Sequence, residues 1–131
     1  MKKLLTNFNK KEFKHINYFS ILGCVMELNS KECEGRIFGV VEPPYNGIEL
    51  AKAFCKIDNF SLDNKKLYGN VTYINNLRYG EFGRRLVEDC KFGFKLVYTS
   101  KSFQDATYMS QILTWYIDIN KQQTNVQPNK K

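Results

Sequence analysis

The chain has 131 residues, a formal net charge of +7, 43% hydrophobic residues and 15% aromatic residues. This length has room for one domain, and the apolar content excludes an intrinsically disordered protein. No apolar run approaches the roughly 20 residues that span a bilayer, so we expect a soluble globular protein with no membrane partner. The opening MKKLLTNFNKK has too short an apolar stretch for a secretory signal, which predicts a cytoplasmic location.

The positive charge lies at the two ends of the chain. Residues 1–14 hold five lysines against one glutamate, residues 121–131 hold three lysines and no acid, and residues 15–120 are neutral. We therefore expect a basic N-terminal arm over residues 1–16, a single domain over residues 17–120 and a disordered basic tail over residues 121–131. The basic ends either keep a neutral domain soluble or contact an anionic partner such as nucleic acid.

The chain has four cysteines without C-x-x-C spacing, and its only histidine is His15. This pattern predicts free thiols in a reducing compartment, with no metal site and no cofactor. Cys90 falls on the apolar face of a predicted helix, which indicates core packing rather than reactivity.

The first half of the domain predicts three elements. Residues 18–28 read YFSILGCVMEL, which is apolar on both faces, as in a strand buried on both sides. Residues 36–41 predict a short strand that ends at Pro43 and Pro44, because neither proline offers an N–H to a ladder. Residues 48–57 place apolar side chains at helical spacing, which predicts one to three helical turns.

The second half gives the clearest pattern, from Lys66 to Ser100. Residues 60–62 and 67–75 predict a hairpin, joined by turn-type residues 63–65. A short helix over residues 81–90 and a strand over residues 94–98 follow, and a long strand occupies residues 107–120. The predicted fold is α+β and mainly β, with a single antiparallel or mixed barrel-like sheet and two short helices.

Taken alone, these residues offer little chemistry. The carboxylates are scattered and His15 lies outside the organised region. The motif YGEFGRRL resembles a phosphate-binding helix start only loosely, because Glu81 would repel an anion. A nucleic-acid-binding sheet is matched equally loosely, and core aromatics with solvated charges are the alternative interpretation. The residues of that loose match are Arg78, Tyr79, Lys91, Phe92, Lys95 and Tyr98.

Residues 35–119 resemble the prohead proteases of tailed phages, whose β-barrel-like fold is shared with the herpesvirus assembly proteases. The junction where that family has an acidic residue and His-Pro is matched by FGVVEPP, residues 38–44. The family's hairpin is matched by NFSLDNKKLYGNVTYI, residues 59–74, and its helix and nucleophile strand by GRRLVEDCKFGFKLVYTS, residues 83–100. A late strand of the family resembles TWYIDIN, residues 114–120.

The chain departs from this family at the catalytic positions. Pro43 occupies the place of the family's catalytic histidine, and a proline neither accepts nor relays a proton. The nucleophilic serine aligns near Tyr98 or Thr99, with Leu96 in place of a small glycine, although Thr99 and Ser100 supply hydroxyls. A hydroxyl without a general base is a poor nucleophile, so the resemblance implies a site without activity.

Three functional hypotheses follow. The first is a non-catalytic structural or assembly protein of a tailed-phage particle. Its partners would be phage structural or scaffold proteins, or further copies of the same chain in a homo-oligomer. The second is an active serine-type protease with a displaced dyad, Thr99 or Ser100 with His15. The third is a small nucleic-acid-binding or host-interacting phage protein that uses its basic ends.

All three hypotheses place the protein in the cytoplasm of the infected host or in the virion. The expected contact residues lie around the family's site, in the loop after the first junction and at the end of the nucleophile strand. They are Glu42, Pro44, Tyr45 and Tyr98.

Overall fold

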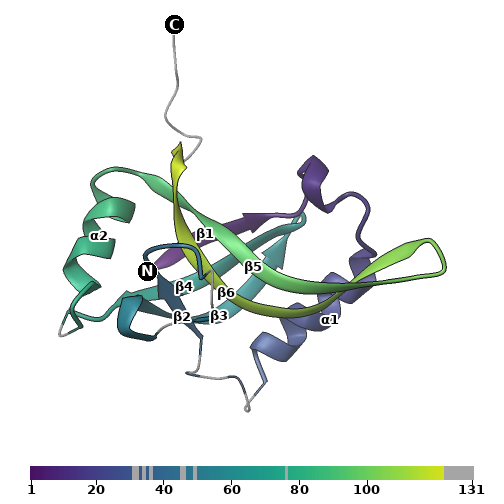
Figure 1. Cartoon of the computed structure of the whole chain (residues 1–131), viewed down its shortest axis with the longest axis horizontal. Coiled ribbons are helices and arrows are strands. Elements are labelled where there is room, and N and C mark those ends of the chain that lie inside the picture. Colours follow the sequence, from purple (N-terminus) through teal and green to yellow (C-terminus); the bar gives the residue numbers. More distant parts are fainter. Residues whose placement is uncertain are drawn as a thin grey trace, which may run out of the picture.

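The computed structural model describes residues 1–30, 33, 35, 37–44, 47–48, 50–75 and 77–122. Six strands form one curled sheet, a half-barrel with the order β1-β4-β3-β2-β6-β5, and two α-helices lie at opposite ends of it (Figure 1). This confirms the α+β, mainly β prediction. The elements are β1 (Lys2–Asn7), η1 (Lys11–Phe13), α1 (Tyr18–Leu28), β2 (Phe38–Val40), η2 (Leu50–Lys52), β3 (Ala53–Asp63), β4 (Lys66–Tyr73), α2 (Gly80–Glu88), β5 (Phe92–Phe103) and β6 (Ala106–Gln122), where η marks a short 3-10 turn.

Both long hairpins turn through two residues with positive φ. These are Asn64 and Lys65 between β3 and β4, at 53° and 62°, and Gln104 and Asp105 between β5 and β6, at 48° and 65°. Two successive positive φ angles are typical of a type I′ turn, whose twist matches that of the paired strands. The expected hairpin around residues 63–65 is confirmed, and residues 101–106, which lie between two separately predicted strands, complete a second hairpin.

Residues 18–28 form helix α1, so the buried strand predicted there is wrong. The Asn17 side chain caps the helix by accepting the Ser20 backbone N–H at 3.1 Å. Phe19 and Met26 are exposed on the face opposite the core, which made the segment look apolar on all sides. The buried residues have helical spacing: Ile21, Cys24, Val25 and Leu28.

The helix predicted over residues 48–57 is also wrong, because β3 begins at Ala53. Among the described residues of this span, Leu50–Lys52 form the one helical turn, η2. β2 pairs with one edge of β3 and β4 with the other, both antiparallel. Pairing on both edges outweighs a weak helical spacing in a short segment.

The first 16 residues, predicted as a basic arm, belong to the domain. β1 pairs antiparallel with β4, and the apolar side chains of this segment are buried in the core. These side chains are Leu5, Phe8, Phe13 and Ile16. At the other end of the chain β6 extends to Gln122, and residues 123–131 of the predicted tail lie outside the described residues.

Helix α1 fills an opening that the short strand β2 leaves between β3 and β6. β2 has three residues and is level with β6 only near Tyr116. Further along β6, the Thr107 carbonyl accepts the Asn17 N–H at 2.8 Å, and the Met109 N–H donates to Ser20 Oγ at 2.9 Å. The start of α1 therefore satisfies edge groups of β6 that no strand reaches.

The far end of α1 performs the same task on β3. The Asn29 side chain donates to the Phe60 carbonyl at 2.7 Å and accepts the Phe60 N–H at 3.0 Å. β3 bulges at this point, between Asp58 and Ser61, and Asn59 has a φ of 51°. The amide of Asn29 thus replaces a strand partner at the bulge.

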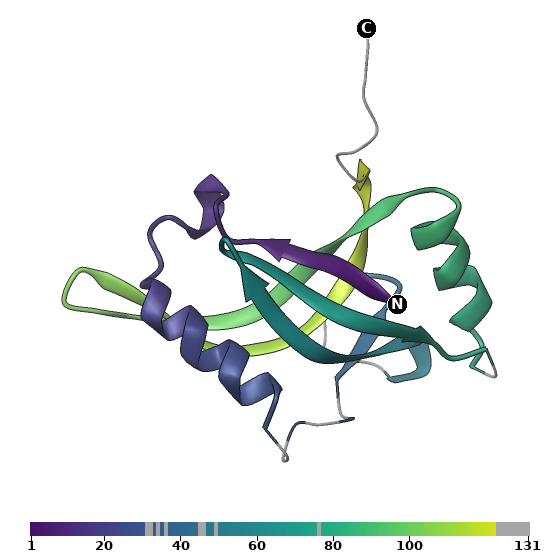
Figure 2. The same ribbon diagram turned by 180° about the vertical axis from the view of Figure 1, so that it is seen from behind.

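The core lies inside the curl of the sheet, where one tryptophan connects β6 with the edge strand β1. Trp115 on β6 is fully buried and stacks on Phe60, with ring centroids 5.6 Å apart. Its Nε1 donates to Thr6 Oγ1 of β1 at 2.8 Å. This bond satisfies the buried indole. Figure 2 shows the same sheet from behind.

Candidate functional site

The structure separates the positions that the resemblance assigns to a base and a nucleophile. Val40, at the end of β2, pairs with Tyr116 on β6. Tyr116 in turn pairs with Lys95 on β5. Ser100 lies five residues further toward the β5–β6 turn, roughly 17 Å away at 3.3 Å per residue. β2 runs parallel to β6 and therefore away from the β5–β6 turn. Pro43, which comes after β2 in the chain, thus lies on the side away from Ser100.

The two candidate hydroxyls come from neighbouring residues of one strand. Thr99 and Ser100 lie on β5, where the β5–β6 register shifts between them. Both residues are exposed, as is His15. Within the described part of the chain, no hydrogen bond joins either hydroxyl to the imidazole of His15. The geometry of the displaced dyad is therefore not formed.

The expected contact residues do not gather at one place. Glu42 is exposed and forms an ion pair with Lys52 of η2, beside the half-buried Pro44. Tyr98 packs near the β5–β6 turn with its ring 6.0 Å from that of Phe13, and burial followed by the charge of Glu12 raises its pKa. The remaining residue, Tyr45, lies outside the described residues.

The glycines of YGEFGRRL allow close packing of α2 on the sheet. A Cβ atom on Gly80 would lie 1.9 Å from the carbonyl oxygen of Ile74, and one on Gly83 would lie 2.3 Å from the ring of Phe54. The N–H groups of both glycines already donate to backbone carbonyls. The motif therefore positions a helix and presents no glycine cradle for a phosphate.

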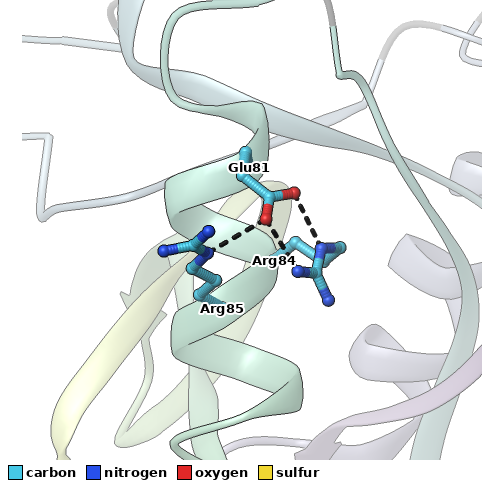
Figure 3. Close-up of polar contacts among 3 residues, drawn as sticks. All are labelled: Glu81, Arg84 and Arg85. Carbon is cyan, nitrogen blue, oxygen red and sulfur yellow. Dashed lines mark hydrogen bonds and ion pairs between the residues drawn. The ribbon is translucent and has the colours of Figure 1, made fainter.

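The two arginines that follow are held by a carboxylate of the same helix (Figure 3). Glu81 accepts two hydrogen bonds from Arg84, at 2.9 and 2.7 Å, and one from Arg85 at 3.0 Å. These bonds lower the pKa of Glu81 to about 2, and the bonds from Arg84 contribute more than the bond from Arg85. The carboxylate stays ionised at neutral pH and offsets the positive charge that an anion would need.

The loose basic and aromatic set does not share a face either. Lys95 points outward from β5, whereas Tyr98, three residues later, points into the concave side. Arg78 lies over the ring of Tyr79 at 5.4 Å, at the start of α2. The six residues therefore do not form the aromatic and basic sheet surface that was considered.

Sequence reasoning missed a polar cluster that joins β1, β4 and α2. Glu88 Oε2 accepts the Tyr73 hydroxyl at 2.5 Å and pairs with Lys3 Nζ at 2.8 Å. Burial alone would raise the pKa of Glu88, but the hydrogen bonds from Lys3 and Tyr73 outweigh it and hold that pKa below its usual value. Burial, followed by the bond to Glu88, raises the pKa of Tyr73. At neutral pH the ionised Glu88 carboxylate therefore accepts a hydrogen bond from the neutral Tyr73 phenol, and this contact joins α2 to β4.

None of the four cysteines forms a disulfide. Cys24 and Cys55 are buried, and burial raises the pKa of Cys55 to about 12. Cys90 is exposed, so its predicted core position is wrong. The reason is that α2 ends at Glu88, and Cys90 lies past the apolar face of the helix.

A pocket of about 330 Å³ lies between the end of α1 and the bulge of β3. Its carboxylate, Asp58, already accepts a hydrogen bond from Asn70 at 3.3 Å. None of the predicted site residues lines it. The lining residues are Leu28, Asn29, Cys33, Gly35, Ile57, Asp58, Asn59 and Phe60.

The outer face of α1 carries an apolar stripe, formed by Phe19, Leu22, Gly23 and Met26, which we call the α1 stripe. Phe19 and Met26 are 80% and 74% exposed, more than any other large apolar side chain of the described residues. They are seven positions apart and therefore share one helix face. Gly23 between them has no heavy atom within 4 Å of its would-be Cβ, which leaves this face open.

No helix in the described part of the chain is long and apolar enough to cross a membrane. The same residues contain no group of three or more His, Cys, Asp or Glu side chains that could hold a metal ion. Comparisons with protein-family models, with curated proteins and with solved structures gave no match. Function is therefore inferred from the residues and geometry of this chain.

Proposed function

We propose that this protein is a non-catalytic relative of the tailed-phage prohead proteases and acts in particle assembly through protein–protein contacts. The observation that carries the proposal is the α1 stripe, where the two most exposed apolar side chains lie on one face of one helix. Apolar faces of this kind commonly mark protein contacts, and a helix face fits a groove or another helix of a partner. The proposed partners are phage structural or scaffold proteins.

The arrangement of the remnant positions supports a binding role over a catalytic one. A protease of this type needs a base within hydrogen-bonding reach of a hydroxyl. Pro43 has no basic atom, and Thr99 and Ser100 lie toward the β5–β6 turn, away from the end of β2. This role requires that the protein is made in the host cytoplasm and then incorporated into the virion.

The proposal is tested by co-expression with the major capsid and scaffolding proteins encoded by the same phage. The wild-type chain is expected to co-sediment with the assembled particles. The double variant Phe19→Ser, Met26→Ser is expected to lose at least about tenfold in bound amount, because each buried apolar side chain contributes roughly 1.5–3 kcal/mol.

The matched control is Leu50→Ser, which removes a 63% exposed apolar side chain from η2 and is expected to bind like the wild type. Thermal unfolding of all three proteins shows that they are folded. A wild-type chain that stays in the supernatant, or a double variant that binds as well as Leu50→Ser, would refute the proposal.

A further inference from the structure

Four segments from distant parts of the sequence lie at the end of the molecule that holds both hairpin turns, where the β5–β6 hairpin projects beyond the other three (Figures 1 and 2). They are η1, the start of α1, the β3–β4 turn and the β5–β6 turn. The Phe8 N–H donates to the Lys65 carbonyl at 2.8 Å, and Lys65 Nζ lies 4.9 Å from the ring centre of Tyr18. Phe13 of η1 contacts Tyr98 of β5. We call this region the turn end.

The turn end concentrates lysines that look scattered in the sequence. The described ion pairs involve none of them, and all of them are exposed except one half-buried lysine, Lys66. They are Lys11 and Lys14 around η1, Lys65 and Lys66 at the β3–β4 turn, and Lys101 on β5. The same segments contain three carboxylates, Glu12, Asp63 and Asp105. Because β1 fixes the N-terminal segment to the sheet, these lysines form a surface rather than a free arm.

Two exposed aromatic side chains accompany this charge. Phe103 is 65% exposed and Tyr108 is 38% exposed, on the part of the hairpin that extends past the core. Lys101 is directly opposite Tyr108 in the ladder, so a cation and two rings share the hairpin tip. Lysines beside exposed rings are the combination that binds single strands, because lysines attract the phosphates and bases stack on the rings.

We infer that the turn end binds single-stranded nucleic acid. A flexible strand can pass between Glu12, Asp63 and Asp105 while its phosphates reach the lysines, whereas a flat anionic bilayer would cover the carboxylates as well. The exposed polar side chains of Ser100 and Gln104 add hydrogen-bonding groups for phosphates and base edges. This activity is separate from the proposed contact through the α1 stripe and needs none of its residues.

The test is fluorescence anisotropy of the full chain with labelled 20-mers of deoxythymidine and of uridine, at 50 and 200 mM salt. Binding that weakens roughly tenfold to twentyfold between these concentrations is expected, as for about three phosphate contacts. The triple variant Lys11→Gln, Lys65→Gln, Lys101→Gln should weaken binding at 50 mM and flatten its salt dependence. Phe103→Ala with Tyr108→Ala should weaken binding by about fivefold or more and leave the salt dependence unchanged.

The control is Lys56→Gln, Lys91→Gln, Lys95→Gln, which removes the same charge from exposed positions elsewhere and should bind like the wild type. The two labelled strands show whether DNA or RNA is preferred. Equal loss in both triple variants, no binding to either strand, or binding only to phosphatidylserine vesicles would overturn the inference.

Discussion

Gly83 shows how closely α2 lies against the sheet. Its missing side chain leaves room for the ring of Phe54, which is fully buried and stacks near Tyr73 and Phe94. Gly83→Ala would place a Cβ 2.3 Å from that ring, and we expect a loss of about 1–3 kcal/mol in the free energy of unfolding because the core must shift. Urea unfolding measures this change.

The control for this substitution is Gly23→Ala on α1, where no heavy atom lies within 4 Å of the new Cβ. That variant is expected to gain up to about 1 kcal/mol, because alanine favours a helix more than glycine does. Equal effects of the two substitutions would show that α2 is not seated as described.

Glu88 makes stability depend on pH on the acid side. Its pKa is lowered in the folded chain by Lys3 and Tyr73, so its stabilising effect is present above the unfolded value of about 4.3. This effect is lost as the pH falls through the folded pKa, because the unfolded state then binds the proton more readily. Glu88→Gln is therefore expected to lose about 1 kcal/mol in the free energy of unfolding at pH 7. Its melting temperature should also fall less steeply than that of the wild type between pH 7 and pH 3.

Glu27→Gln, which changes an exposed carboxylate on α1, is the comparison for this series. Its melts should follow those of the wild type throughout. The melting temperature of Glu88→Gln could instead fall as steeply with acid as that of the wild type. That result would mean that the cluster of Lys3, Tyr73 and Glu88 does not form.

At the scale of the elements, α1 is attached to the sheet by polar contacts at both of its ends. Asn29→Ala leaves the Phe60 N–H and carbonyl without their partner at the β3 bulge. We expect a loss of about 1–3 kcal/mol in urea unfolding, since a buried backbone group that loses its hydrogen bond costs that much. Asn9→Ala removes another asparagine, whose side-chain bonds to Asn7 and to the Asn64 carbonyl are exposed to solvent. It should cost clearly less, and equal losses would contradict the role given to Asn29.

The elements that the sequence predicts correctly are those with a strong single period. β4, α2 and β6 fall where alternation or helical spacing places them. α1 was misassigned because the exposed Phe19 and Met26 hide its helical period, and β3 because its start has a weak helical spacing that pairing with β2 and β4 overrides. The Gln104–Asp105 turn lacks the Asn-Gly composition that marks a type I′ turn in a sequence.

At the scale of the whole molecule, the candidate site depended on contacts that no local pattern encodes. The resemblance supplied Pro43 and the segment from Tyr98 to Ser100 as corresponding positions, but their separation follows from the register of β2 with β6 and of β6 with β5. The turn end was equally hidden, because only the folded chain places the segments of Lys14, Lys65 and Lys101 at the same end of the molecule. Exposure of Phe19 and Met26 likewise required the three-dimensional packing of α1.

The central claim is that this chain binds and does not cleave. It is tested most directly by intact-mass spectrometry of particles assembled with the wild-type chain and with a Thr99→Ala, Ser100→Ala variant. We expect the chain to be present in the particles, with the same full-length masses for it and for the capsid and scaffolding proteins in both preparations. A truncated chain or scaffold that appears with the wild type and disappears with the variant would contradict the account.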